Sequence, residues 1–93
     1  AGSDYEIEEF QLSQNPLLLK EIEGKSLSEL ELGRRSGAMV LAIRDNGRLI
    51  ANPGGATQMA AGQLLIVLGS KTQLSTFQRL LGEAVDTIES MPG

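Results

Sequence analysis

Hydrophobic residues gather in three short runs near the middle of the chain. Residues 38–43 and 49–51 lie on either side of Asn46-Gly47, and residues 64–68 end at a glycine. Asn-Gly tolerates positive φ at both central positions of a two-residue type I′ turn, so the first two runs predict a β-hairpin. The third run predicts a further strand of the same antiparallel sheet.

The first strand of this hairpin is hydrophobic on both of its predicted faces. Strict alternation gives two sets of residues, one on each face: Met39, Leu41 and Ile43, and Ala38, Val40 and Ala42. A strand that is apolar on both sides is typically covered on both sides. We therefore expect a helix layer to cover one face of the sheet and a second copy of the chain to cover the other.

The segment YEIEEFQL near the N-terminus also alternates, but its phase changes halfway. Tyr5 and Ile7 point one way, whereas Phe10 and Leu12 point the other. A β-bulge at the two glutamates between them reconciles the halves in one strand. A helix that uses Ile7 and Phe10 is the alternative, and the pattern leaves both structures open.

Local capping signals mark where helices begin. Asn15-Pro16 suits an N-cap followed by a first helical position, which predicts one or two helical turns up to residue 22. Ser26 and Glu29 have the spacing of a capping box and predict a short helix that ends at Gly33.

A second capping box, Ser70 with Gln73, predicts another helix. Its apolar face has helical spacing and consists of Leu74, Phe77, Leu80 and Leu81. The spacing continues past Gly82, so residues 83–90 are predicted to form a further helix or a continuation. Together, the elements predict an α+β fold: a small antiparallel sheet of about four strands with two or more helices on one face.

The composition restricts the classes of function. The 93 residues suffice for one small domain, and their net charge of −4 leaves no basic surplus for binding nucleic acid. The absence of Cys and His removes thiolate chemistry, the commonest general base and the commonest metal ligand. Ser and Thr fall mostly at predicted helix caps, so we do not expect an enzyme.

The chain carries no signal for a membrane or for secretion. Its longest apolar run has six residues, which is too short for direct membrane insertion, and no signal peptide is visible. The lack of cysteine suits a cytoplasmic location. We interpret residues 1–3, Ala-Gly-Ser, as a remnant of cloning.

Several of these motifs together resemble a known family. LSELELGRRSGAMVLAIRDNGRLI, a following proline turn, and then Gly62 and LLIVLGS are similar to the TrkA-C domain. This domain is the C-terminal regulatory lobe of RCK (regulator of conductance of potassium) subunits. The resemblance covers about residues 5–81, so we expect residues 4–82 to form a TrkA-C-like domain and residues 83–93 to form a helical extension or tail.

The resemblance implies a two-fold homodimer formed through the sheet and its adjoining loops. It also implies a partner, a membrane-embedded cation channel or transporter subunit, because such domains serve potassium channels, potassium uptake systems and some cation antiporters. No GxGxxG motif is present, so the Rossmann lobe that normally precedes this domain is not part of the chain.

In several TrkA-C members the dimer cleft binds cyclic di-AMP, and we expect this or another nucleotide as the effector. The resemblance carries the binding positions over to Arg34, Arg35, Met39, Val40 and Pro53. It implies that Arg34 or Arg35 meets a phosphate, while Val40 and Pro53 flank an adenine.

Two positions depart from the family pattern. Met39 stands where binding members tend to have Asn, which removes a hydrogen bond to a base. Gly62-Gln63 replaces the usual Gly-Asp before the last strand, which alters the local turn.

Asn52 is a further candidate for ligand contact, because it begins a Pro-Gly-Gly loop whose backbone is able to approach a ligand closely.

Each candidate also has a purely structural interpretation. Arg34 and Arg35 are typical of a helix C-terminus, and Asn52-Pro53-Gly54-Gly55 is typical of a plain loop. Acidic residues near the N-terminus are typical of a solvated strand face rather than a Ca²⁺ site, so no metal is expected: Asp4, Glu6, Glu8 and Glu9.

Two functions therefore follow from the sequence. The first is a regulatory, ligand-sensing and dimerisation domain of a potassium or other cation channel or transporter. The second is a purely structural dimerisation module of the same kind of transport protein, with no ligand.

Overall fold

The sheet is built around the predicted hairpin. Asn46 and Gly47 have φ of 53° and 85° and connect β2 (Met39–Asp45) to β3 (Arg48–Ala51). Positive φ at both positions is what a type I′ turn requires, so this prediction is confirmed. The structure, a computed structural model, describes residues 4–86.

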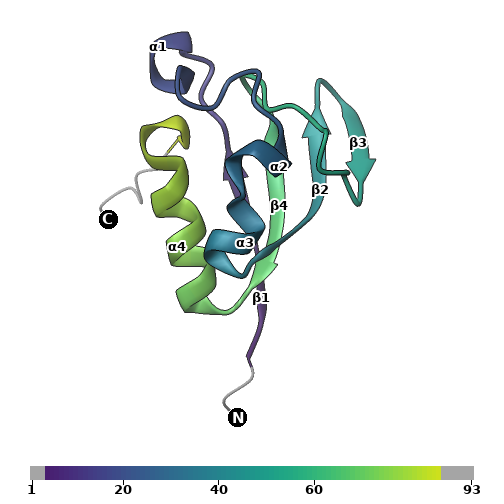
Figure 1. Ribbon diagram of the computed structural model, residues 1–93. Helices are drawn as coiled ribbons and strands as arrows, with labels where there is room; N and C mark the ends of the chain where they lie inside the picture. Colours follow the sequence, from purple (N-terminus) through teal and green to yellow (C-terminus); the bar gives the residue numbers. More distant parts are fainter. Residues whose placement is uncertain (1–3, 87–93) are drawn as a thin grey trace, which may run out of the picture.

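Four antiparallel strands are present within residues 4–86, in the spatial order β1-β4-β2-β3. β1 (Glu6–Gln11) pairs with β4 (Leu64–Gly69), which pairs in turn with β2. β1 and β3 are therefore the two edges of the sheet (Figure 1). The α+β fold with an antiparallel sheet is confirmed.

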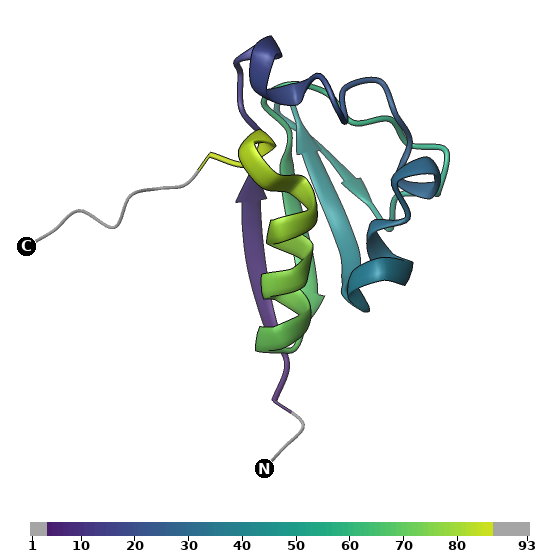
Figure 2. The same cartoon turned by 60° about the vertical axis from the view of Figure 1, so that its left-hand side comes forward.

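The helices within residues 4–86 are α1 (Pro16–Leu19), α2 (Leu27–Leu30), α3 (Leu32–Ser36) and α4 (Lys71–Leu81), followed by a 3₁₀ turn, η1 (Gly82–Ala84). All but α3 and η1 begin directly after a predicted capping residue. Asn15 caps α1, and both capping boxes form, at α2 and at α4. Figure 2 shows α4 along β1 and β4, with α2 and α3 beside β2, so one face of the sheet carries the helices.

The core lies between α4 and the inner face of the sheet. Phe77 of α4 is fully buried, and its ring centre lies 5.2 Å from that of Phe10 on β1. Leu65 and Val67 of β4 are also fully buried. Burying a side chain of this size contributes about 1.5–3 kcal/mol before the entropy of ordering is subtracted. This packing fixes α4 on the sheet.

β1 is a strand, as expected, but the bulge predicted near Glu8 and Glu9 is wrong. The register of β1 with β4 is continuous from Glu6 to Gln11. Phe10 faces the helices and is buried, whereas Ile7 faces outward and is 62% exposed. The change of hydrophobic phase therefore reflects two apolar surfaces, one on each face of the sheet.

The bulge lies in β2 instead. Its register with β4 shifts between Val40 and Ala42, so Leu41 is the extra residue. Met39 and Ala42 therefore share one face of the sheet, while Val40 and Ile43 share the other. The strict alternation predicted for this strand is wrong, because one inserted residue exchanges the faces of all that follow.

The helix that begins after Ser26 does not end at Gly33. Glu31 adopts the left-handed conformation (φ 53°), ends α2 and starts α3, which continues to Ser36 and ends at Gly37. Leu32 directly follows this break and is 2% exposed. Glutamate rarely adopts this conformation, so the sequence carries no local signal for the break.

Residues 83–86 do not continue α4 as the helix predicted over residues 83–90. After η1, Val85 is extended and forms an antiparallel bridge with Leu12. This bridge, rather than helical packing, buries Val85 to 8% exposure. Residues 87–90 lie outside the described residues.

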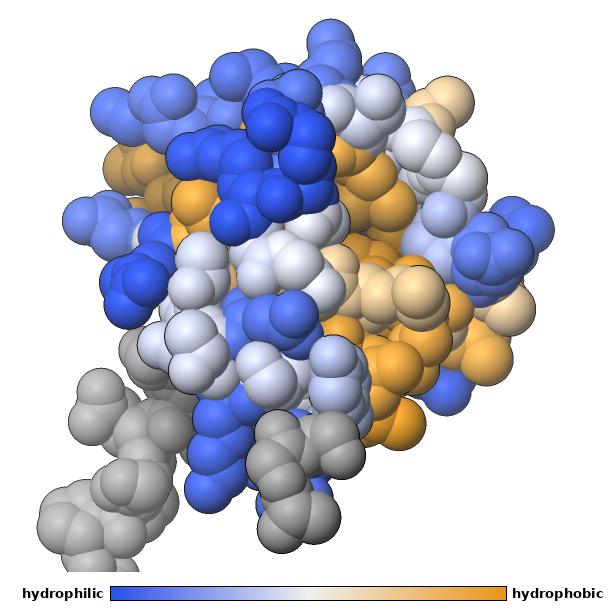
Figure 3. All heavy atoms as spheres, turned by 60° about the horizontal axis from the view of Figure 1, so that its bottom comes forward, coloured by the Kyte–Doolittle hydropathy of each residue, from blue (hydrophilic) through white to orange (hydrophobic). Residues whose placement is uncertain are grey.

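The sheet face opposite the helices carries exposed hydrophobic side chains. Ile7, Met39 and Leu49 are 62%, 60% and 53% exposed, and Ile66 of β4 is half-buried on the same face. Figure 3 views the molecule from below and shows hydrophobic atoms gathered on the side where β2 and β3 lie. For this sheet face the sequence predicts cover by a second copy of the chain.

The side chain of Gln73 fills the space between α4 and two glycines. A Cβ atom on Gly37, which follows α3, would lie 2.8 Å from its Nε2 atom. A Cβ atom on Gly69, at the end of β4, would lie 3.2 Å from its Oε1 atom. A larger residue at either glycine would therefore have to displace Gln73, whose Oε1 accepts from the Ser70 N–H in the capping box at 2.9 Å.

Candidate functional site

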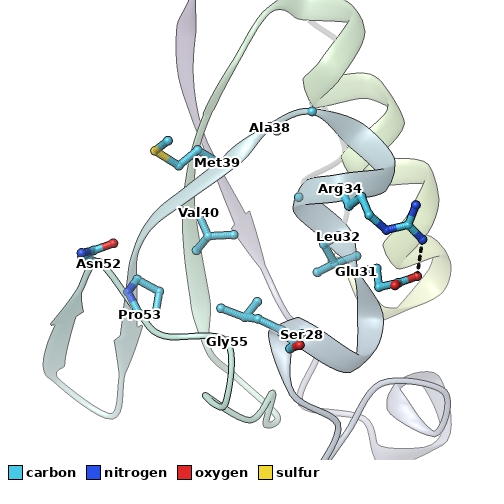
Figure 4. Close-up of a pocket in the computed structure, with 13 residues that line it drawn as sticks. Ser28, Glu31, Leu32, Arg34, Ala38, Met39, Val40, Asn52, Pro53 and Gly55 are labelled. Carbon is cyan, nitrogen blue, oxygen red and sulfur yellow. Dashed lines mark hydrogen bonds and ion pairs between the residues drawn. The ribbon is translucent and has the colours of Figure 1, made fainter.

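A groove of about 640 Å³ lies between the short helices, the start of β2 and the loop after β3 (Figure 4). Three separate segments build it. They contribute Leu27, Ser28, Glu31, Leu32, Gly33 and Arg34; then Gly37, Ala38, Met39 and Val40; and then Asn52, Pro53 and Gly55.

Backbone hydrogen bonds hold the loop after β3 against α2. The Ser28 N–H donates to the Gly55 carbonyl at 2.8 Å, and the Leu27 N–H donates to the Thr57 carbonyl at 2.9 Å. The Asn52 N–H donates to the carbonyl of the bulged Leu41 at 2.7 Å. The loop is therefore fixed at both ends. The two N–H groups at the start of α2 are already used and do not offer an anion site.

The floor of the groove is apolar. Leu32 and Ala38 are buried, and Val40 and Pro53 are half-buried. Figure 4 shows Val40 and Pro53 on neighbouring sides of the space, with Leu32 opposite them on α3. Such a surface suits a flat apolar group, with polar specificity left to the rim.

One lip of the groove carries an ion pair. An Arg34 guanidinium nitrogen lies 2.5 Å from a Glu31 carboxylate oxygen, one helical turn away. Through this hydrogen bond Arg34 holds the pKa of the Glu31 carboxyl below its usual range, and the carboxylate in turn raises the pKa of Arg34. Both side chains are exposed, so solvent screens the pair and its contribution to stability is small.

The structure brings five of the six predicted site residues to this groove: Arg34, Met39, Val40, Asn52 and Pro53. Arg35 is the exception, because it lies on α3 outside the lining and is exposed. Contact of these residues with a ligand stays a prediction.

Sequence reasoning missed several residues of the lining. Glu31 carried a usable signal, since it precedes Arg34 by three residues and such pairs are neighbours on a helix. Leu27 and Leu32 carried no such signal, because apolar residues at helical spacing are equally typical of a buried stripe and of a groove lining.

Gln63, the second departure from the family pattern, closes the loop before β4. It is 2% exposed, and its Oε1 accepts from the Ala60 N–H at 2.9 Å. Its Nε2 donates to Asp45 Oδ2 at 3.1 Å and to the Gln58 carbonyl at 3.3 Å. The altered residue is thus a hydrogen-bonded structural element at the end of β2, next to Asp45, whereas the groove is lined by the first residues of β2, Met39 and Val40.

Four of the thirteen lining residues have polar or charged side chains: Ser28, Glu31, Arg34 and Asn52. Ser28 supplies a hydroxyl, but the carboxylate on the same lip, Glu31, is bonded to Arg34. Within residues 4–86, no group of three or more His, Cys, Asp or Glu side chains is arranged to hold a metal ion. No helix in this part of the chain is long and apolar enough to cross a membrane.

Comparison with known protein families identifies one match. The family model of the TrkA-C domain matches residues 20–82, which is more than half of the chain. The chain belongs to the TrkA-C family. The match contains all three segments of the groove and confirms the resemblance seen in the sequence. Comparison with curated proteins found no match.

Solved structures of this fold include two complexes with cyclic di-AMP. An RCK_C domain dimer of BusR from S. agalactiae, in complex with c-di-AMP, is 24% identical, with a TM-score of 0.70 over 81% of this TrkA-C chain and 88% of the other. The RCK C domain of the potassium transport protein KtrA, in complex with c-di-AMP, is 21% identical, with a TM-score of 0.69 over 82% of each chain.

A third similar structure belongs to a longer protein. S. agalactiae BusR in complex with its busAB-promotor DNA is 24% identical and gives a TM-score of 0.70 over 81% of this chain. The chain spans 35% of that BusR chain. At these identities the comparisons establish the shared fold.

Proposed function

We propose that this TrkA-C domain is a ligand-sensing regulatory domain of a potassium or other cation transport protein, and that it acts as a two-fold dimer. A nucleotide, with cyclic di-AMP as the first candidate, binds at the dimer interface in contact with the groove of each copy. Binding favours one geometry of the dimer, and this preference biases the transport protein. The domain then lies in the cytoplasm, attached to or associated with a membrane-embedded channel or transporter subunit.

The observation that carries the proposal is the convergence of the groove. Residues from α2 and α3, from the start of β2 and from the loop after β3 meet around one apolar floor with one arginine at its lip. These are the segments to which the family resemblance assigned ligand contacts. The similar domains of BusR and KtrA were solved in complex with c-di-AMP, so this dinucleotide is the first ligand to test.

The exposed apolar face supports a dimer. A single copy leaves Ile7, Met39 and Leu49 more than half exposed on the sheet face opposite the helices. Met39 also lines the groove, so a second copy packed on this face lies next to the ligand site. The RCK_C domain of BusR is likewise a dimer in its c-di-AMP complex.

A structural dimerisation module without a ligand is the second candidate. Two observations favour it: the Glu31 carboxylate occupies the lip that a phosphate would approach, and Met39 offers no hydrogen bond to a base. In this alternative the groove is simply part of the dimer contact.

We propose that the surface of this domain does not bind nucleic acid. The net charge of −4 disfavours contact with phosphates. One similar structure, however, is BusR in complex with promoter DNA, and the present chain spans 35% of that BusR chain. In a parent protein of this kind, DNA contact would belong to another part of the chain.

Isothermal titration of the 93-residue chain with c-di-AMP tests the proposal. We expect micromolar binding with one nucleotide per two chains, and no heat with cyclic di-GMP. Arg34→Ala should weaken binding at least tenfold, since a charge-assisted hydrogen bond contributes about 1.5–3 kcal/mol. Arg79→Ala, on the exposed side of α4, is the matched control and should bind as the unchanged protein does.

Glu31→Gln separates the two candidates further. Removing the carboxylate frees Arg34 and should tighten nucleotide binding about threefold or more. Sedimentation at several concentrations reports the dimer independently. A dimer that gives no heat with c-di-AMP, for either the unchanged protein or Glu31→Gln, would support the structural module and reject this ligand.

A further inference from the structure

A second groove lies at the opposite edge of the sheet from the candidate ligand site. It has a volume of about 530 Å³ and is bounded by Gln78 of α4 and Leu64 of β4. It follows the edge of β1 that has no strand beside it among residues 4–86, called the free edge below. The rest of its lining is Glu8, Glu9, Phe10, Gln11, Val85 and Asp86. An edge strand with a groove beside it is a template for another extended segment.

The end of the described chain already pairs with this edge. The Ser13 N–H donates to the Ala84 carbonyl and the Asp86 N–H donates to the Gln11 carbonyl, both at 2.7 Å. By contrast, the Leu12 N–H points to β4, where it donates to the Gln63 carbonyl at 2.8 Å. The odd-numbered residues of this strand therefore direct their backbone groups to the free edge.

Farther along β1, the same alternation determines which backbone groups face this edge. Ile7 and Glu9 direct their N–H and C=O groups away from β4, because hydrogen-bond direction alternates along an antiparallel strand. Within residues 4–86, strand pairing on this edge stops at the Leu12–Val85 bridge. The residues from Glu6 to Glu9 are exposed. This stretch can accept one more strand.

Charge decides which strand fits. A second copy laid antiparallel on the same edge would bring Glu6, Glu8 and Glu9 close to their own copies, and opposed like charges are destabilising. Continuing the Leu12–Val85 register would place residue 89 of the chain itself, a glutamate, opposite Glu8. The groove has three acidic side chains, Glu8, Glu9 and Asp86, and no basic one.

We propose that the free edge of β1 binds an extended segment rich in lysine and arginine on a partner protein, as a fifth strand. Its backbone pairs with Ile7 and Glu9. Its apolar side chains pack on Phe10 and Val85 at the floor of the groove, and its cations meet the acidic rim. This surface is separate from the nucleotide groove, and the proposal holds whether or not a nucleotide binds there.

Fluorescence anisotropy of the 93-residue chain with a labelled nine-residue peptide of alternating lysine and valine tests the proposal. We expect saturable binding that weakens with added salt, and at least tenfold weaker binding of the matched peptide with glutamate in place of lysine. By NMR, the peptide should slow amide exchange at Ile7 and Glu9. The amides of Glu8 and Phe10, which face β4, should not change.

Two variants separate backbone pairing from charge. Ile7→Pro removes an N–H on the free edge and leaves the bonds to β4, a position that proline tolerates. It should weaken peptide binding at least tenfold, whereas Ile7→Val should not. Glu8→Gln combined with Glu9→Gln should weaken it about fivefold. Thermal melting confirms that each variant is folded.

Three results would overturn the proposal. The first is equal binding of the lysine and glutamate peptides, and the second is unchanged binding by both the Ile7→Pro and the double glutamine variants. The third is slow exchange of Ile7 and Glu9 in the free protein that is lost when residues 87–93 are removed. That last result would assign the edge to the chain's own C-terminal segment.

Discussion

Gln63→Glu tests the hydrogen bonding of the loop before β4 with a change of almost no volume. The glutamine amide oxygen must face the Ala60 N–H, which is a donor, so the amide nitrogen faces the Asp45 carboxylate and the Gln58 carbonyl. Glutamate keeps the oxygen that accepts from Ala60. It replaces the donor by a second oxygen that faces two acceptors.

The magnitude follows from the 3.1 Å separation between Gln63 Nε2 and Asp45 Oδ2. Two unit charges at that distance repel by about 5 kcal/mol at an effective dielectric constant of about 20. Protonation offers a cheaper route, because neutralising a glutamate of ordinary pKa at pH 7 costs about 3.7 kcal/mol and restores an O–H donor. We therefore expect a loss of about 2–4 kcal/mol in the free energy of unfolding at pH 7, with the protonation cost as its limit.

The loss should depend on pH with a definite sign. The neighbouring oxygens and burial raise the pKa of the introduced carboxyl in the folded state above its value in the unfolded chain. The loss in the free energy of unfolding, relative to the unchanged protein, is then complete above the folded-state pKa. It shrinks as the pH falls through that pKa and is nearly gone at about pH 4. Urea denaturation at a fixed protein concentration, repeated from pH 7.5 to 4, measures this difference.

Gln58→Glu is the matched control, since the Gln58 side chain is exposed and only its backbone carbonyl takes part in the network. It should change the free energy of unfolding by less than about 0.5 kcal/mol at every pH. A Gln63→Glu protein as stable as the unchanged one at pH 7, or a deficit that does not change with pH, would refute the hydrogen-bond assignment.

Two further substitutions test the local signals that fix the fold. Ser70→Ala removes the oxygen that accepts from the Gln73 N–H at the start of α4 and should cost about 1 kcal/mol in urea denaturation, while Ser75→Ala on the exposed side of the same helix should cost less than about 0.5. Gly62→Ala places a Cβ at a φ of 78° and against the amide of Gln14, so thermal melting should show a loss of about 1–3 kcal/mol. Gly54→Ala, where a Cβ meets nothing within 4 Å, should leave the melting temperature nearly unchanged, and equal effects at both glycines would contradict the role of φ.

Sequence reasoning succeeded where a short local signal has one physical meaning. Asn46-Gly47 fits a type I′ turn, and the Ser26 and Ser70 boxes each satisfy N–H groups within one helical turn. These arrangements depend on neighbouring residues only, so the local sequence contains them. The order of strands and helices along the chain followed from the spacing of the apolar runs and caps, and the TrkA-C family followed from the resemblance.

It failed where distant packing decides a local conformation. The bulge at Leu41 depends on how β2 aligns with β4, and the left-handed Glu31 accompanies the burial of Leu32. Val85 kept helical spacing in the sequence but is extended, because a bridge to Leu12 offers it buried surface. For Leu41 and Val85 the partner strand lies more than twenty residues away along the chain, so no local pattern contains it.

The candidate site was found from the family resemblance rather than from the pattern of residues. Spacing alone gave no reason to join Arg34 with Val40 and Pro53, since the loop that carries Pro53 is brought to α2 by backbone hydrogen bonds. Arg34 and Arg35 look alike in the sequence. Both lie on the five-residue helix α3, where successive side chains point in different directions, and only Arg34 lines the groove.

The side chain of Gln73 lies against Gly37 and Gly69, between the wall of the groove and the longest helix of the described chain. α3 also packs directly on α4, so we expect a ligand that displaces α3 to displace α4 as well. The far end of α4 leads through η1 to the bridge with Leu12. We therefore expect α4 to link the groove at one of its ends to the end of β1 at the other.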